Sequence, residues 1–377
     1  MAHPCTAVCP KKCITIRGGV SYIDQSVCVK CGRCKSVCPY DAIAHLTRPC
    51  AEACGVKAIE SDELGRAKIV PERCVSCGMC MVNCPFGAIA DKSQFFQLIR
   101  ALRRGDRIVA EVAPAYVGQF GDRVTPAMFK ASLKELGFSG VHEVALGADM
   151  GAATEAKHYA EEVIPGKQPY MFTSCCPSWA VLIKHYFPET ADKISNTLTP
   201  MVATARTIKQ KDPDCRVVFI GPCAAKKLEA SRRTIRSDVD FVITFEELSA
   251  IFEVCGIDPL KGDGTEDINE ATGAGRGYAC AGGVAGAIEK CIAAYYPGSE
   301  VKIEHVEGLE DCRKMLLLAK MGRKNGCLIE GMACPGGCIA GAGTNIPLSK
   351  AMTAVKKTVS TSSKAVPPKE LAEVVLD

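Results

Sequence analysis

The sequence predicts a large α/β domain built mainly on parallel strands, preceded by a small cysteine-rich domain. Two observations carry this prediction. Beyond residue 105, short apolar runs alternate with segments of helical periodicity, which is typical of parallel sheets covered by helices. Before residue 91, a run of the form Cys-x2-Cys-x2-Cys-x3-Cys-Pro occurs twice, which is typical of ligands to iron–sulfur clusters.

Composition narrows the class of protein. The chain has 377 residues, 47% of them hydrophobic and 23% charged, which is enough for two or three domains. The net charge of +4 is small and no basic run is present, so nucleic acid is not an expected partner. No apolar stretch is long enough to span a membrane, and cysteines stand near the N-terminus where an apolar signal region would lie. We therefore expect a cytoplasmic protein with redox partners.

The cysteine run occupies residues 28–39 (CVKCGRCKSVCP) and 74–85 (CVSCGMCMVNCP). It resembles the run that binds four-iron clusters in bacterial ferredoxins, where the fourth cysteine of each run ligates the other cluster. Zinc is the alternative, but zinc sites rarely use four closely spaced thiolates followed by proline. The pattern predicts two [4Fe–4S] clusters, one held by Cys28, Cys31, Cys34 and Cys84 and the other by Cys74, Cys77, Cys80 and Cys38.

A weaker echo precedes each run. The segments Pro4 to Cys9 and Pro49 to Cys54 both read Pro-Cys-x3-Cys, and an isoleucine follows each within five residues. Paired half-motifs of this kind predict a third [4Fe–4S] cluster, held by Cys5, Cys9, Cys50 and Cys54, with Cys13 as a substitute ligand. The alternative is a remnant that keeps its cysteines free.

The remaining organisation follows from periodicity. An α+β iron–sulfur domain covers residues 1–90, and residues 91–105 form an amphipathic connector helix that ends at Gly105. A catalytic domain covers 106–349, and 350–377, rich in Lys, Ser and Thr, reads as a mobile tail with a short terminal helix. Expected strands lie at 107–112, 141–146, 170–173, 216–220, 241–244 and 301–306, with helices at 245–254 and 309–321.

Three further cysteine segments lie in the second domain: TSCCPSW at 173–179, GPCAAKKLE at 221–229 and EGMACPGGCIAG at 330–341. Cys176 and Cys223 each follow a predicted strand, and the glycines of the third segment allow a close approach of backbone to a cluster. In this order the segments resemble the signatures of the iron-only ([FeFe]) hydrogenases, and the resemblance covers most of residues 1–350.

The resemblance implies two sheet-and-helix lobes with the active H-cluster between them. That centre joins a [4Fe–4S] cube to a two-iron unit with CO, CN and bridging dithiolate ligands, supplied by hydrogenase maturation proteins. The resemblance assigns the cube to four cysteines, of which Cys338 also bridges to the two-iron unit: Cys176, Cys223, Cys334 and Cys338. It implies that Lys226 donates to a cyanide and that four residues line the pocket: Ala113, Pro114, Pro222 and Met332. Packing, or surface solvation for Lys226, is the alternative.

The family's proton relay runs through Cys, Glu, Ser, Glu and Arg. Cys175 precedes a ligand, so its side chain can face the open coordination site, and Glu155 and Ser195 lie 20 residues to either side of it. His158 and Glu162 stand at the two outer positions, which predicts an altered relay through His158. The alternative is that these residues form only the polar face of a helix. Gly221 stands where fast family members carry methionine, which predicts extra space and slower turnover.

The function that these features favour is reversible oxidation of H2 to protons and electrons, with the electrons leaving through the N-terminal clusters to ferredoxin or another electron carrier. One alternative is a low-turnover regulatory protein that senses H2. The other is an iron–sulfur assembly scaffold of the same fold, which Cys175, Lys226, Glu155 and Met332 disfavour because they serve chemistry at a two-iron site.

Overall fold

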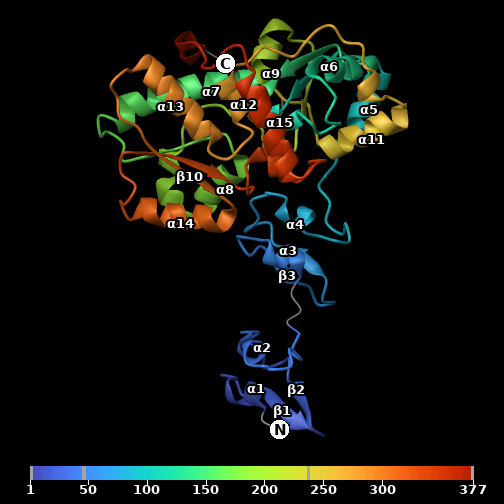
Figure 1. The fold of residues 1–377 in the computed structure, drawn as a ribbon, viewed down its shortest axis with the longest axis vertical. Helices are drawn as coiled ribbons and strands as arrows, with labels where there is room; N and C mark the ends of the chain where they lie inside the picture. The colour runs from blue at the N-terminus through green and yellow to red at the C-terminus, as the bar shows by residue number, and fades with distance from the viewer. Residues whose placement is uncertain (1–2, 45–47, 236–237, 375–377) are drawn as a thin grey trace.

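The computed structural model describes residues 3–44, 48–235 and 238–374. The chain forms a broad two-lobed body, and its N-terminal residues extend from this body as a narrow stalk (Figure 1). Each lobe is built on its own parallel sheet, one of four strands and one of three. The predicted architecture of two sheet-and-helix lobes after an α+β N-terminal region is therefore confirmed.

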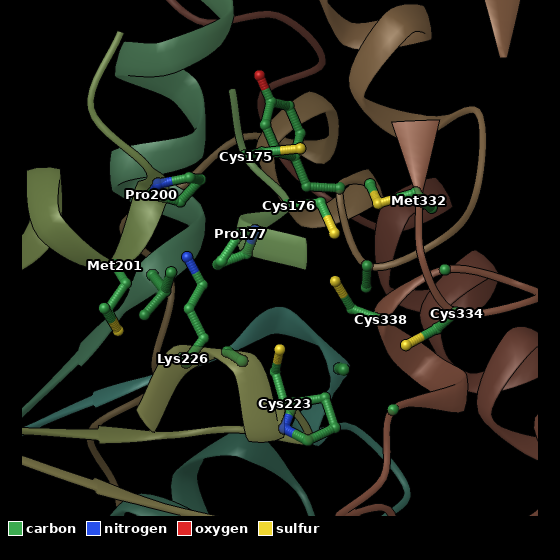
Figure 2. A pocket seen from close by; sticks show the side chains of 18 of the residues that line it. Cys175, Cys176, Pro177, Pro200, Met201, Cys223, Lys226, Met332, Cys334 and Cys338 are labelled. Carbon is green, nitrogen blue, oxygen red and sulfur yellow. The ribbon is translucent and has the colours of Figure 1, made fainter. Parts of the chain in front are cut away.

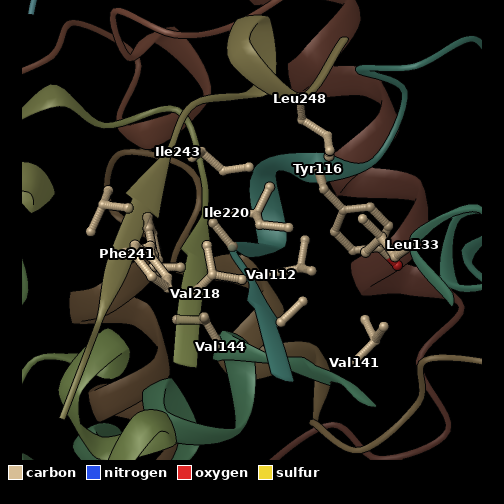
Figure 3. Packing of buried hydrophobic residues seen from close by; sticks show 14 of the residues in the cluster. Val112, Tyr116, Leu133, Val141, Val144, Val218, Ile220, Phe241, Ile243 and Leu248 are labelled. Atoms are coloured by element: carbon tan, nitrogen blue, oxygen red, sulfur yellow. The ribbon is translucent and has the colours of Figure 1, made fainter. Parts of the chain in front are cut away.

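The larger sheet has the order β6-β5-β8-β9. Its strands are β5 (Ile108–Val112), β6 (Gly140–Glu143), β8 (Arg216–Ile220) and β9 (Phe241–Ile243). β5 is buried along its whole length, as expected for a central parallel strand, and all of its residues except Glu111 are apolar. Figure 3 shows Val112, Val218 and Ile243 of this sheet packed beside Tyr116 and Leu248. Helices around this core are α5 (Phe95–Arg103), α6 (Pro126–Glu135), α9 (Pro200–Lys211) and α11 (Phe245–Cys255).

The smaller sheet has the order β10-β11-β7. Its strands are β7 (Met171–Phe172), β10 (Lys302–Glu307) and β11 (Cys327–Met332), and the helices of this lobe are α8 (Pro177–Tyr186), α13 (Gly283–Tyr295) and α14 (Leu309–Lys320). The central strand, β11, is absent from the sequence prediction because Glu330 and Gly331 interrupt its apolar run. Both have tertiary reasons: Glu330 accepts from the N–H groups of Gly282 and Ala285 at the start of α13, and a β-carbon at Gly331 would overlap the Trp179 ring.

The structure contains helices at two places where the sequence predicted something else. The expected strand at 141–146 ends at Glu143, and α7 (Val144–His158) begins immediately. The expected mobile tail instead opens with α15 (Leu348–Ser360), whose Ala351 and Val355 are buried in the main core. The Lys, Ser and Thr residues that indicated disorder largely occupy the outer face of this amphipathic helix. A short 3-10 turn, η6 (Lys369–Glu373), then packs on α7.

The stalk consists of two separate units (Figure 1). The outer unit, residues 3–44, contains α1 (Pro4–Ala7), β1 (Ile14–Arg17), β2 (Val20–Ile23) and α2 (Arg33–Ser36). The inner unit, residues 48–90, contains α3 (Pro49–Glu52), β3 (Ile59–Ser61), β4 (Ala67–Ile69) and α4 (Met79–Val82). In each unit the two short helices contact each other beside a hairpin.

Several short elements complete the fold. These are η1 (Pro114–Tyr116), η2 (Tyr159–Val163), η3 (Pro188–Lys193), α10 (Ala224–Ala230), η4 (Pro259–Lys261), α12 (Gly273–Gly277) and η5 (Cys338–Ala340).

Candidate metal centre

A cavity with an empty volume of about 820 Å³ lies between the two lobes. It forms where parallel strands of both sheets end, which is the usual position of a site in such sheets. Ala113 follows β5 and Cys223 lies just beyond β8 in one lobe, while Cys176 follows β7 and Cys334 follows β11 in the other. The fold therefore brings together cysteines that are far apart in sequence.

Four thiols line this cavity and point into the same space, as Figure 2 shows: Cys176, Cys223, Cys334 and Cys338. Burial and then the neighbouring thiol groups raise the pKa of Cys223 to about 11, and the same causes raise the pKa of Cys334 and Cys338. Buried thiolates at such close quarters repel one another unless a cationic centre compensates them. The set therefore has the chemistry of a ligand quartet for an iron–sulfur cube.

The loop that carries two of these thiols is held by direct backbone packing. Gly337 has φ +88° and its missing β-carbon would clash with the backbone nitrogen of Ala281, while a β-carbon at Gly341 would lie 2.5 Å from the Pro222 carbonyl oxygen. Only glycine fits at these two positions. The loop therefore holds Cys338 against the segment that carries Cys223.

Lys226 lies on α10, and its ammonium points into the cavity (Figure 2). The side chain is buried, and its Nζ pairs with Glu229 Oε2 at 2.6 Å. Burial acts to lower the pKa of Lys226, but the Glu229 carboxylate and the Cys223 thiol outweigh it and the pKa is raised. A charged donor thus faces the same cavity as Cys338, together with the other predicted lining residues Ala113, Pro114, Pro222 and Met332, and with Met201 of α9. An anionic ligand beside Cys338 would fit this wall.

Three of the predicted relay residues lie near one another. Cys175 lines the cavity, and burial raises its pKa. Glu155, 2% exposed on α7, accepts hydrogen bonds from the backbone N–H and the hydroxyl of Ser174 at 3.1 and 3.2 Å. Burial raises the pKa of Glu155 to about 7, and the Ser195 hydroxyl acts to lower it. Ser195 itself donates to Thr197 at 2.9 Å.

The outer relay residues are less closely connected. His158 is the last residue of α7, and among the described residues no hydrogen bond joins it to Glu155. The chain then makes a π-helical turn, η2, which breaks the helical register that would have aligned Glu162 with Glu155. Glu162 pairs with Lys167 at 3.1 Å. The role of His158 stays a prediction.

The stalk cysteines do not group as the sequence predicted. Cys9, Cys28, Cys31 and Cys34 line one pocket in the outer unit, together with Cys13, whose sulfur lies 3.4 Å from that of Cys9. Cys54, Cys74, Cys77 and Cys80 line a second pocket, which belongs to the inner unit. Each run of three cysteines therefore takes its neighbour from the half-motif that precedes it.

The structure does not bring together any of the three ligand sets that the sequence predicted for the stalk, and one reason applies to all three. A cluster held by Cys28, Cys31, Cys34 and Cys84, its partner through Cys38, and a third cluster held by Cys5, Cys9, Cys50 and Cys54 would each need ligands from both units, which lie apart (Figure 1). The signal was present in the sequence, because Cys9 precedes Cys28 by 19 residues and Cys54 precedes Cys74 by 20.

The inner unit docks directly on the main cavity. Cys77 lines both the inner pocket and the cavity between the lobes. A β-carbon at Gly78 would lie 2.6 Å from the Ala342 side chain and 3.2 Å from that of Ala224, so the start of α4 is packed against the segments that follow Cys338 and Cys223. Lys227 also pairs with Asp91 at 2.7 Å, which joins the connector to α10. The inner thiols are thus neighbours of the central quartet.

The family profile described as "Iron only hydrogenase large subunit, C-terminal domain" matches residues 106–342, more than half of the chain. The chain belongs to the iron-only hydrogenase family. In the stalk of this chain, the family profile "4Fe-4S binding domain" matches residues 21–44, and the profile "LdpA Fe-S cluster-binding domain" matches residues 44–95. The boundary between the two matches agrees with the boundary between the outer and inner units.

Individual relatives place the chain more closely. The periplasmic [Fe] hydrogenase large subunit of Nitratidesulfovibrio vulgaris is 30% identical over 375 residues, which is 85% of each chain. Iron hydrogenase 1 of Clostridium pasteurianum is 27% identical over 304 residues, and the present chain spans about half (53%) of its length. The cytosolic Fe-S cluster assembly factor NAR1 of Kluyveromyces lactis is 34% identical over only 95 residues, 25% of this chain.

Solved structures show the same fold. [FeFe]-hydrogenase HydA1 from Chlamydomonas reinhardtii superposes with a TM-score of 0.63 at 22% identity, covering 76% of this chain and 95% of that one. None of the helices in the described ranges combines the length and the apolar character needed to cross a membrane.

Three features of the cavity and its surroundings were not predicted from the sequence. The Phe219 ring fills the space that was expected beside Gly221, so the expectation of an opened pocket is wrong. Tyr278 and Met201 line the cavity, and Glu111 is fully buried on β5 with neither carboxylate oxygen hydrogen-bonded within the described chain. Each residue lies in an apolar run or a glycine-rich loop, where periodicity indicates only burial.

Proposed function

We propose that this chain is an iron-only hydrogenase that catalyses the reversible conversion of H2 into two protons and two electrons. The observation that carries the proposal is the joint placement of Cys175 and Lys226 around the cavity that the four-thiol set lines. A cluster carrier needs only the four thiols, whereas a buried proton donor and a buried cation serve chemistry at an added metal unit.

The residues around the cavity would have separate roles in cluster binding, ligand orientation and proton transfer. Cys176, Cys223, Cys334 and Cys338 would hold the H-cluster, which when bound supplies the redox-active iron at which H2 is split or formed. The Lys226 ammonium would orient an anionic ligand of the two-iron unit, and the largely apolar wall excludes water. Cys175 holds a proton at its sulfur, and Glu155, whose pKa is near neutrality, exchanges it towards Ser195.

Electrons would pass through the stalk. We assign one [4Fe–4S] cluster to Cys9, Cys28, Cys31 and Cys34 and one to Cys54, Cys74, Cys77 and Cys80, with Cys13 as the reserve thiol of the outer site. The inner cluster would lie next to the H-cluster, and the outer one would face ferredoxin or another carrier. Maturation proteins would deliver the two-iron unit. We place the protein in the cytoplasm, because its 24 cysteines need a reducing compartment as metal ligands.

The direct test is turnover of the matured protein. Reduced methyl viologen should drive H2 evolution, and H2 should reduce the oxidised dye. Cys175→Ala should lower both rates by about a hundredfold or more, the usual contribution of a positioned proton donor. The matched control is Cys215→Ala, which removes a buried thiol far from the cavity and should leave both rates unchanged. A matured, iron-replete parent protein without turnover would contradict the proposal.

The match to NAR1 favours a second candidate, a cluster assembly factor of the same fold. Such a protein would bind the four-iron cube and gain nothing from maturation. A third candidate, the H2 sensor, is favoured by the altered outer relay at His158 and Glu162. A sensor would hold the H-cluster but turn over slowly. The infrared bands of iron-bound carbonyl and cyanide would therefore distinguish a hydrogenase from an assembly factor, and the turnover rate would distinguish it from a sensor.

A further inference from the structure

Tyr278 lines the cavity and carries an unexplained hydroxyl. The residue follows α12 and is 6% exposed, and its hydroxyl has no hydrogen-bond partner within the described part of the chain. A buried hydroxyl without a partner costs free energy, whereas phenylalanine at the same place would cost nothing of this kind. A tyrosine at this position therefore points to a partner that forms only in the working protein.

The hydroxyl lies beside α7, the helix that carries Glu155, and Tyr278 lines the cavity with Cys175. A β-carbon at Gly151 would be 3.7 Å from the Tyr278 hydroxyl oxygen, and Gly151 is one turn before Glu155 on the same face of α7. Tyr278 also lines the cavity together with Cys175. The charges of Glu155 and Cys175 are, after burial, the largest causes that raise the pKa of Tyr278. Among the described residues, no direct hydrogen bond joins Cys175 to Glu155.

We infer that the Tyr278 hydroxyl is the link through which protons pass between Cys175 and Glu155. In the direction of H2 oxidation, the Cys175 thiol gives its proton to the hydroxyl oxygen while the hydroxyl gives its own proton to the Glu155 carboxylate. One proton moves, Tyr278 keeps its neutral state, and the reverse transfer supplies H2 formation. Tyr278 thus extends the relay of the proposed hydrogenase by a residue that its sequence pattern did not reveal.

The test removes the oxygen and keeps the ring. Infrared spectra are recorded on the matured protein at rest, in which the proposed hydrogen bonds of the Tyr278 hydroxyl are formed, so the readout does not depend on turnover. Loss in Cys175→Ala identifies the S–H band of that thiol, and loss in Glu155→Gln identifies the carboxyl band. In Tyr278→Phe we expect both bands to move to higher frequency, since both groups lose a hydrogen bond. Tyr159→Phe is the matched control, because its hydroxyl bonds to the Gly326 carbonyl oxygen away from the cavity.

Rates then test the transfer itself. In the matured protein, Tyr278→Phe should lower turnover by about tenfold or more with little change in the affinity for H2, because the hydroxyl acts on protons and not on gas binding. Unchanged Cys175 and Glu155 bands in Tyr278→Phe would overturn the inference, even if the parent is an active hydrogenase. If Tyr278→Phe shifts both bands but the parent protein shows no turnover, the link through Tyr278 is supported and only the proposed function is contradicted.

Discussion

Phe219 and Gly221 depend on each other. A β-carbon at Gly221 would lie 2.5 Å from Cε1 of the Phe219 ring, which is closer than any real contact, and 2.9 Å from the Ala113 side chain. Phe219 lies on β8 and lines the cavity, and Gly221 follows the last residue of that strand, so the ring occupies the place that a larger side chain at 221 would take. The absence of a side chain at 221 is compensated by an aromatic ring two residues earlier.

This relationship predicts non-additive mutations. Gly221→Met alone should destabilise the protein by about 1–3 kcal/mol through overpacking. Phe219→Ala alone should cost about 3–5 kcal/mol, because Phe219 is buried. In the double variant the methionine fills the vacated space, so the combined cost should fall below the sum by about 1 kcal/mol or more. Thermal unfolding midpoints of the four proteins measure this, and strict additivity would contradict the packing described.

Glu155 should titrate near neutrality. Burial raises its pKa from 4.5 to about 7, so the native state holds a proton that the unfolded chain has lost between these values. The associated stability is fully present below pH 4.5 and is lost as pH rises through 7, an effect on the order of 3 kcal/mol at pH 8. A protonated carboxyl band that fades with a midpoint near 7, and is absent in Glu155→Gln, would confirm this; a band that persists at pH 9 would not.

Glu111 should weaken the fold as pH rises. Burial raises its pKa well above 4.5, and the Lys226 ammonium only partly offsets this. The native state therefore keeps the proton above pH 4.5, and stability falls by at most about 1.4 kcal/mol per pH unit until the group ionises. The unfolding midpoint of Glu111→Gln relative to the parent should rise between pH 5 and pH 8. Glu189→Gln, at an exposed ion pair with Lys320, is the control. A difference in unfolding midpoint between Glu111→Gln and the parent that does not change with pH would contradict this and show that Glu111 has a partner.

Cysteine variants test the regrouped stalk. Without maturation the parent should hold about 12 iron atoms in three cubes. Cys54→Ala removes a proposed ligand of the inner cluster and should lower the content to about eight, whereas Cys84→Ala should leave it unchanged, because Cys84 does not line the inner pocket. Iron and sulfide analysis gives the counts. Equal losses in the two variants would favour the ferredoxin pairing that the sequence alone indicated.

The parts of the fold that follow from local pattern were predictable. β5, β8 and β9 are recognised by their mostly apolar runs, interrupted only by Glu111 in β5 and preceded by Arg216 in β8, because both faces of a parallel strand are buried. The four ligand cysteines stand out by spacing and glycine content. β11 was not recognised, because Glu330 serves α13 and Gly331 makes room for Trp179, and these reasons are tertiary.

The same limit applies at the site. Cys175 and Lys226 could be placed because they are adjacent or close in sequence to ligands that carry a recognisable spacing. Phe219, Tyr278 and Glu111 carry no such mark, since each acquires its role from a neighbour on another element. The predicted grouping of the stalk cysteines differs from the structure for a related reason. Which half-motif lies beside each run of three cysteines depends on how the two units separate in space.

We propose that Cys176, Cys223, Cys334 and Cys338 would hold a cube that receives a two-iron unit in maturation, and the infrared spectrum of the matured protein is the sharpest test of this. We expect sharp bands from iron-bound carbonyl and cyanide in the parent, and a shift of the cyanide bands in Lys226→Met. A parent protein that takes up its full complement of cubes and still shows no such bands after maturation would contradict the claim.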